Sequence, residues 1–180
     1  MEADAVLSDN VGGAYSATRY LLERGYRRIG VILGIRGATT SEERLAGYRK
    51  ALEEMGLAYD ETLIVWGGYR VEGGRRATAK LLSLPEPPDA IFSTNNLMTI
   101  GVLQELFRRG VRIPGETGVV GFDDLEWAEM ANPPLTVVAQ RPYEIGHRAV
   151  KLLLDRLGAE EPLPPREERV PVDLKPRGSA

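Results

Sequence analysis

The sequence has no cysteine, a single histidine and no excess of basic residues. Without cysteine, disulfides, thiol catalysis and thiolate metal sites are excluded. The 23 Lys and Arg residues are outnumbered by 26 Asp and Glu residues, for a formal charge of −3, which argues against a surface that grips nucleic acid. No apolar run approaches the roughly 18 residues of a membrane span, and residues 1–10 lack the basic start and apolar stretch of a signal peptide. We therefore expect a soluble, cytoplasmic protein.

The apolar residues that are present, 43% of the 180, fall into short runs. These runs are Ala5–Leu7, Ile29–Leu33, Leu63–Trp66, Ala90–Phe92 and Val119–Phe122. They are rich in β-branched residues and bounded by Gly, Asp or Asn, which is typical of buried strands in a parallel sheet. Most onsets recur about every 30 residues, the length of a βαβ unit. A solenoid has a similar period, but the segments share no residue signature, so the pattern predicts a doubly wound, three-layer α/β fold.

Amphipathic stretches between these runs predict the helices. They cover residues 11–24, 40–55, 73–84, 97–109 and 145–157. Thr40 and Glu43 have the spacing of a capping box, and Gly56 fits a helix stop. Five of the 12 prolines lie within residues 162–176, which predicts an extended connection there with one edge strand over residues 170–174.

Polar residues follow most of the predicted strands. They are Asp9 and Asn10, Tyr69, Asn95 and Asn96, and Asp123 and Asp124, with Arg44 in the first turns of the helix after the second strand. The carboxyl ends of parallel strands meet at one edge, where ligands bind. Carboxylates accept hydrogen bonds from hydroxyls and Arg donates in a planar fork, so this set suits a sugar, another polyol or a small heterocycle. Taken singly, each residue has a structural alternative, such as a helix cap for Asp or Asn.

Motifs of several enzyme classes are missing. The sequence has no Walker motif, no GxGxxG fingerprint and no GxSxG elbow. His147 has no motif partner, so we interpret it as structural. Asp123 and Asp124 have the chemistry for magnesium binding or acid–base work, but neighbouring residues at a strand end point to different sides. We predict no catalytic residue, no metal and no cofactor, with a metal-dependent enzyme kept as an alternative.

Four segments carry a resemblance to a known family. They are DNVGGAYSATRYLLERGYRRIGVILG, SEERLAGYRKALEEMGL, AIFSTNNLMTIGVLQELFRRGVRIPGETGVVGFDD and NPPLTVVAQRPYEIGHRAVKLLLDRL. In this order they cover nearly the whole chain, and the chain resembles the effector-binding core of lactose-repressor/galactose-repressor (LacI/GalR) transcription regulators. The resemblance implies a core of two α/β subdomains of the type I periplasmic-binding-protein fold, with a small-molecule effector between them.

The resemblance also implies a set of ligand contacts at positions that match the family pattern. They are Asp9, Arg44, Tyr69, Asn95, Asp123 and Gln140. The chain departs from the pattern at Asn95–Asn96, where the family has Asn-Asp, and at Val137, where the family has a second threonine. The first departure removes a charge near the cleft and bears on which class of effector is bound.

The same resemblance divides the chain. Residues 1–25 and 142–160 correspond to a remnant of the amino-terminal subdomain, residues 26–141 and 166–180 to the carboxyl-terminal subdomain, and the DNA-binding headpiece is absent. We expect an effector-sensing domain of a regulator that controls operator DNA through that headpiece, and a homodimer. We expect weak or undetectable effector binding and no DNA binding by the 180 residues alone. The alternative of the same fold is the substrate-binding component of a sugar transporter.

Overall fold

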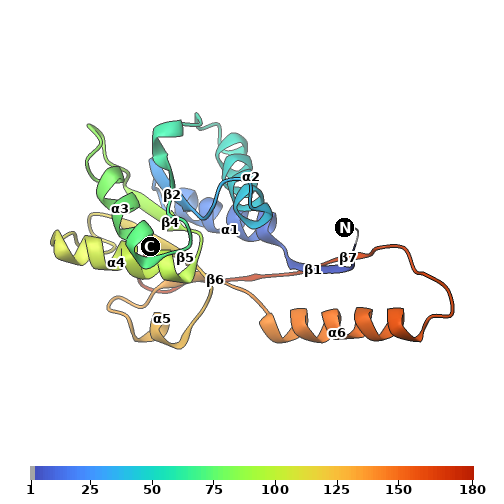
Figure 1. The fold of residues 1–180 in the computed structure, drawn as a ribbon. Helices are drawn as coiled ribbons and strands as arrows, with labels where there is room; N and C mark the ends of the chain where they lie inside the picture. The colour runs from blue at the N-terminus through green and yellow to red at the C-terminus, as the bar shows by residue number, and fades with distance from the viewer. Residues whose placement is uncertain (1–2) are drawn as a thin grey trace.

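The structure, a computed structural model, describes residues 3–180 (Figure 1). The strands are β1 (Ala5–Ser8), β2 (Ile29–Leu33), β3 (Ile64–Trp66), β4 (Ala90–Ser93), β5 (Gly118–Phe122), β6 (Thr136–Ala139), β7 (Glu167–Val170) and β8 (Asp173–Lys175). The helices are α1 (Asn10–Glu23), α2 (Thr39–Glu54), the 3-10 turn η1 (Glu61–Leu63), α3 (Val71–Leu81), α4 (Asn96–Arg108), α5 (Glu126–Met130) and α6 (Pro142–Gly158).

Six strands form the main sheet in the order β3-β2-β4-β5-β6-β8. The first five are parallel, and β8 joins β6 as an antiparallel edge. Helices α1 and α2 pack together over one core cluster and α3 and α4 over another, so the sheet is the middle of three layers. This arrangement confirms the predicted three-layer α/β fold. The strand order reverses between β2 and β4, and in such sheets a crevice opens at that point, beyond the carboxyl ends of the strands.

We call the six-stranded sheet with α1–α5 the body. Its two core clusters are closed to solvent: Tyr48 and Phe92 are 0% exposed in the first cluster, and Leu81 and Met98 are 0% exposed in the second. Burial on this scale contributes about 1.5–3 kcal/mol for each large apolar side chain. The body therefore has the ingredients of an independently stable lobe.

We call the remaining elements, β1, β7 and α6, the arm. Strands β1 and β7 form a separate two-stranded parallel sheet, and α6 runs out from the body beside it (Figure 1). Within the described residues, Leu152 is the one buried residue of α6. Several large apolar side chains of the helix are exposed, namely Tyr143, Val150, Leu153, Leu154 and Leu157. No helix within residues 3–180 is long and apolar enough to cross a bilayer.

Some local predictions differ from the structure. The capping box is wrong, because α2 begins after Ala38 without a side-chain cap and Glu43 turns toward other elements. The single edge strand over residues 170–174 is replaced by β7 and β8, which belong to different sheets. Helix α1 packs on α2 and on the main sheet, although the division by resemblance groups residues 1–25 with the amino-terminal remnant. Its small and apolar residues Ala14, Ala17 and Leu21 are 0% exposed there.

Candidate functional site

Side chains at the carboxyl ends of three strands, one of the arm and two of the body, meet at the carboxyl edge of the body. Ser8 ends β1, Asp123 follows β5 and Gln140 follows β6. The Ser8 hydroxyl donates to Gln140 Oε1, and Gln140 Nε2 donates to Asp123 Oδ1. The second carboxylate oxygen of Asp123 accepts from the backbone N–H of Asn96 at 3.1 Å. Asp123 is thus fixed from two sides at the edge where the topology predicts a ligand.

Arg44 is the buried cation of this edge. Its side chain comes from α2, is only 5% exposed, and lies over the Phe122 ring with 3.7 Å between the guanidinium carbon and the ring centroid. Nε donates to Asn10 Oδ1 at 2.9 Å, and Nη1 donates to the carbonyl of Thr94. Burial lowers the pKa of Arg44, and the nearby Asp123 carboxylate opposes that shift. Because a guanidinium stays protonated in proteins, Arg44 brings a fixed positive charge into a poorly hydrated place.

Tyr69 is held beside Arg44 by its backbone and by two hydroxyls. Its φ of 57° lies in the left-handed region, which is uncommon for a non-glycine residue and clusters at functional sites. Its hydroxyl hydrogen-bonds to the Thr40 hydroxyl at 2.7 Å and to the Ser41 hydroxyl at 2.6 Å. The ring occupies the space of an absent side chain at Gly34, where a Cβ would lie 1.9 Å from it. Asp123 shares the strained backbone, with φ of 83°.

Asp9 and Asn95 play a different part. The Asp9 carboxylate accepts from the Gly12 N–H at 2.8 Å, and Asn95 Oδ1 accepts from the Leu97 N–H at 3.0 Å. Both are N-caps, of α1 and α4. Of the six predicted contact residues, the structure thus brings Arg44, Tyr69, Asp123 and Gln140 toward one another. It places Asp9 and Asn95 at helix starts on the same edge.

The prediction did not include Ser8, Asn10 or Glu43 among the contact residues. Asn10 is 1% exposed and links two neighbours, accepting from Arg44 and donating from Nδ2 to Glu43 Oε2 at 2.7 Å. The sequence places Asn10 among the polar residues at the strand ends and marks it as a possible helix cap, but does not pair it with Arg44 or Glu43. Its partners lie 33 and 34 positions away, so no local signal identifies its role.

Asp124 belongs to another cluster, as the prediction that neighbouring strand-end residues point apart requires. Its carboxylate pairs with Lys175 at 2.8 Å and with Arg177 at 2.9 Å. Burial opposes ionisation, but these two cations hold the pKa of Asp124 below its usual value. Within residues 3–180 no group of three or more His, Asp or Glu side chains is arranged to hold a metal ion.

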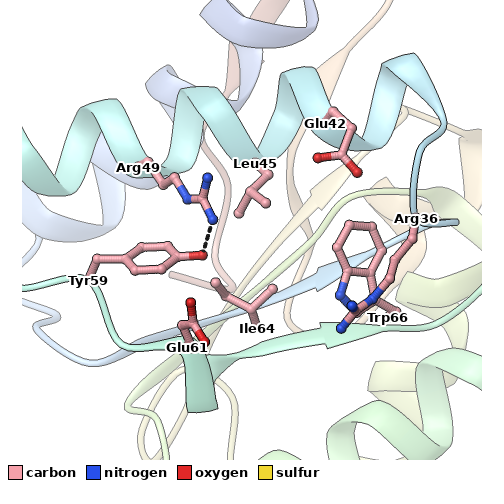
Figure 2. A pocket seen from close by; sticks show the side chains of 8 residues that line it. All are labelled: Arg36, Glu42, Leu45, Arg49, Tyr59, Glu61, Ile64 and Trp66. Atoms are coloured by element: carbon pink, nitrogen blue, oxygen red, sulfur yellow. Dashed lines mark hydrogen bonds between the residues drawn. The ribbon is translucent and has the colours of Figure 1, made fainter.

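A separate groove of about 350 Å³ runs along the free edge of the sheet, between α2 and β3 (Figure 2). Its walls are Arg36, Glu42, Leu45, Arg49, Tyr59, Glu61, Ile64 and Trp66. The Arg36 guanidinium lies over the Trp66 ring at 5.2 Å, and Arg49 donates to the Tyr59 hydroxyl. None of the six predicted contact residues lines this groove, so it is distinct from the Arg44–Asp123 site.

Comparison with known proteins gives consistent relatives. Residues 18–180 match the family model of the periplasmic binding protein-like domain. The chain is 38% identical over 157 residues to the HTH-type transcriptional repressor CytR of Escherichia coli, covering 87% of this chain and 46% of CytR. It is 40% identical over 158 residues to the HTH-type transcriptional regulator CelR of Thermobifida fusca, covering 88% of this chain and 46% of CelR.

Among solved structures, the transcriptional regulator CelR in complex with cellobiose superposes with a TM-score of 0.93. The identity is 38%, and the match covers 99% of this chain and 54% of that one. The chain thus spans about half the length of the relatives that it matches. With a family match over residues 18–180 and a fold shared with a cellobiose-bound regulator, this chain belongs to the periplasmic-binding-protein-like domains of LacI-family transcriptional regulators.

Proposed function

We propose that the chain is the effector-sensing part of a cytoplasmic LacI-type transcriptional regulator, and that its effector is a sugar or a related small polar molecule. The observation that carries the proposal is the buried Arg44 guanidinium beside the anchored Asp123 carboxylate at the carboxyl edge of the parallel sheet. The relatives reported above are regulators, and one of them is a cellobiose complex. The first fact favours a regulator over a component of a sugar transporter, and the second favours a sugar as the effector.

The donor and acceptor set fits vicinal hydroxyls. Asn10 and Thr94 engage Nε and one Nη1 hydrogen of Arg44, so Nη2 and the second Nη1 hydrogen are the donors for two adjacent oxygens, and Asp123 accepts from hydroxyls. The Tyr69 ring offers an apolar face beside them. Asp9, Asn95 and Gln140 complete the proposed contacts from the rim. The proposed site binds a neutral ligand without any metal or cofactor, and we propose no catalytic role for these residues.

Regulation follows from how the chain crosses between its two parts. The body and the arm are joined near Ser8–Asp9, Gln140–Pro142 and Val170–Asp173. We propose that the arm belongs with an amino-terminal subdomain, with the first boundary at Asp9 rather than at residue 25, and that the effector binds between the two subdomains. An effector that prefers one arrangement shifts the pair, and a coupling of about 1–3 kcal/mol suffices to alter operator binding through a separate headpiece.

A homodimer is proposed for the same protein. Leu103, Val111 and Ile113 line an apolar groove of about 470 Å³ beside the exposed Phe107 on the outer face of α4. Phe107 is 88% exposed, and apolar groups concentrated on one face are typical of association surfaces. Sedimentation at micromolar concentration tests this, because a monomer there contradicts it.

The site is tested by calorimetric titration of the full-length gene product with cellobiose, followed by measurement of its affinity for operator DNA. Asp123→Asn removes the charge, and Arg44→Lys the planar fork, of a contact worth about 1.5–3 kcal/mol, so each is expected to weaken cellobiose binding roughly 10- to 100-fold. Asp124→Asn is the matched control, because its carboxylate pairs with Lys175 and Arg177 instead. Equal losses from Asp123→Asn and Asp124→Asn would contradict the proposed site.

A further inference from the structure

A continuous path of side-chain contacts joins the arm to Arg44. It starts at Arg169 of β7, whose Nη2 lies 2.6 Å from Glu43 Oε1. The other Glu43 oxygen accepts from Asn10 Nδ2 at 2.7 Å, and Asn10 Oδ1 accepts from Arg44 Nε at 2.9 Å. Glu43 uses one carboxylate oxygen toward each neighbour, and Asn10 uses its amide nitrogen toward Glu43 and its amide oxygen toward Arg44, so the donors on both sides of the path point toward the Glu43 carboxylate.

The two outer groups of the path are partly exposed and the two inner groups are buried. The Arg169 side chain is 38% exposed and that of Glu43 16%, while Asn10 is 1% exposed and Arg44 5%. Exposed ion pairs contribute little because water and salt screen them. Buried hydrogen-bonded networks behave differently, since an unmatched donor or acceptor inside them is costly and their members adopt one arrangement. The inner half of the path thus fixes geometry, and its outer half connects that geometry to a second sheet.

Glu43 holds this position at the expense of a local alternative. A glutamate three residues after Thr40 has the spacing to close a capping box at the start of α2. In the structure, the Glu42 carboxylate accepts from the Gly37 N–H at 2.9 Å instead, and the Thr40 hydroxyl binds Tyr69. Arg169 holds the pKa of Glu43 below its usual value, so the carboxylate is charged and accepts from both sides at neutral pH.

We propose that Glu43, Asn10 and Arg169 are positioning residues that orient the Arg44 guanidinium and tie that orientation to the arm. A shift of β7 relative to the body then changes how Arg44 is presented, and a ligand that fixes Arg44 restrains β7. The consequence for the ligand rests on the proposed function, whereas the orientation of Arg44 does not. The reciprocity between the two sites is a thermodynamic requirement.

The direct test is the solvent exchange of the Arg44 Nε–H proton, measured by nitrogen-15 NMR and assigned by its loss in Arg44→Lys. Glu43→Ala and Arg169→Ala are expected to speed this exchange at least about tenfold, a change of roughly 1.4 kcal/mol. Arg169→Lys keeps the cation and is expected to restore slow exchange in part. Glu167→Ala removes the other partner of Arg169, at 2.8 Å, and is expected to leave Arg44 unchanged.

The outcomes separate the parts of the proposal. If exchange at Arg44 is the same in Glu43→Ala as in the parent, the positioning role is overturned. If Glu43→Ala speeds exchange and Arg169→Ala does not, the connection to the arm is overturned. If Glu43→Ala fails to fold, the exchange rate of Arg44 in Arg169→Ala decides whether the path positions Arg44. The Arg169 side chain is partly exposed, so its removal is expected to leave the fold intact.

A second measurement, titration with cellobiose, keeps this proposal distinct from the proposed function. Glu43→Ala and Arg169→Ala are expected to weaken binding by the loss of a well-placed Arg44, and Glu167→Ala is not. If the unsubstituted protein binds no cellobiose, the proposed ligand class fails while the exchange result still decides the positioning role.

Discussion

The body and the arm are built on opposite principles. Large apolar side chains in the body reach zero exposure on both faces of the sheet, as Phe92 and Leu81 do. In the arm, α6 leaves Leu154 at 61% and Leu157 at 73% exposure. The arm is fixed to itself chiefly by strand pairing and by charged groups, with Asp4 joined to Arg156 and Arg166. One part buries its apolar side chains, whereas the other leaves an apolar surface exposed within residues 3–180.

The body provides most of the packing that stabilises the structure, whereas the arm is the part that moves more easily. Burial in the body positions Arg44 and Asp123 rigidly, which is what a preorganised binding edge requires. The arm contributes few apolar contacts, and regions of that kind open with low free energy. A regulator that responds to a small molecule needs a rigid binding edge and an element that is more easily displaced. Ligand binding at a rigid site has no effect elsewhere unless such an element moves with it.

The largest expected effect is on the free energy of unfolding, and it is seen by comparing a buried leucine of the body with an exposed leucine of the arm. Leu81→Ala removes a side chain with 0% exposure from the second core cluster and is expected to lower the free energy of unfolding by about 2–5 kcal/mol. Leu154→Ala, at 61% exposure on α6, is expected to change it by less than about 0.5 kcal/mol. Urea denaturation followed by circular dichroism measures both. Similar losses for the two variants would mean that the arm is packed as tightly as the body.

The next largest effect comes from replacing two helical glycines by alanine, which is expected to change stability in opposite directions. A Cβ at Gly47 of α2 would lie 2.2 Å from the carbonyl oxygen of Val11, so Gly47→Ala forces α1 and α2 apart and is expected to cost about 1–3 kcal/mol. A Cβ at Gly146 of α6 meets nothing within 4 Å, so Gly146→Ala is expected to stabilise the helix by about 0.5–1 kcal/mol. The same denaturation experiment reads the first, and amide exchange in α6 reads the second. A loss of protection in α6 from Gly146→Ala would contradict an unpacked arm.

The body could be predicted from the sequence more completely than the arm. Its main strands are runs of consecutive apolar residues, the pattern of a strand that is buried on both faces, as in Ile29–Leu33. Strand β7, with the sequence EERV, has no such pattern and is a strand because β1 pairs with it. Strand β6 and the five-residue helix α5 were also not predicted, since each is short and follows or precedes prolines in the sequence.

The candidate site also has a part that could be predicted from the sequence and a part that could not. Residues that end strands, such as Asp123, could be placed at the carboxyl edge because parallel strands share their direction. The roles of Asn10 and Glu43 could not, because their partners lie far away in the chain and outcompete the local caps that their positions suggest. The Arg169 guanidinium, 2.6 Å from Glu43, adds the attraction of a full positive charge that a backbone N–H does not carry, so the distant arginine overrides the nearby N–H.

The smallest expected effect concerns Asp4 and is confined to the arm. Its carboxylate accepts from Arg156 at 2.7 Å and from the backbone N–H of Arg166 at 2.8 Å, and the Arg156 hydrogen bonds hold its pKa far below the usual value of 3.8. A lowered pKa means that this contribution is complete above about pH 4 and is lost as the pH falls toward the lowered value. Asp4→Asn is therefore expected to speed amide exchange in β1 and β7 at pH 7 and leave β4 unchanged, while Asp155→Asn, which removes a more exposed partner of Arg166, changes neither. Faster exchange in β4 as well would show that the arm and the body unfold as one unit, and the distinction between them would fall.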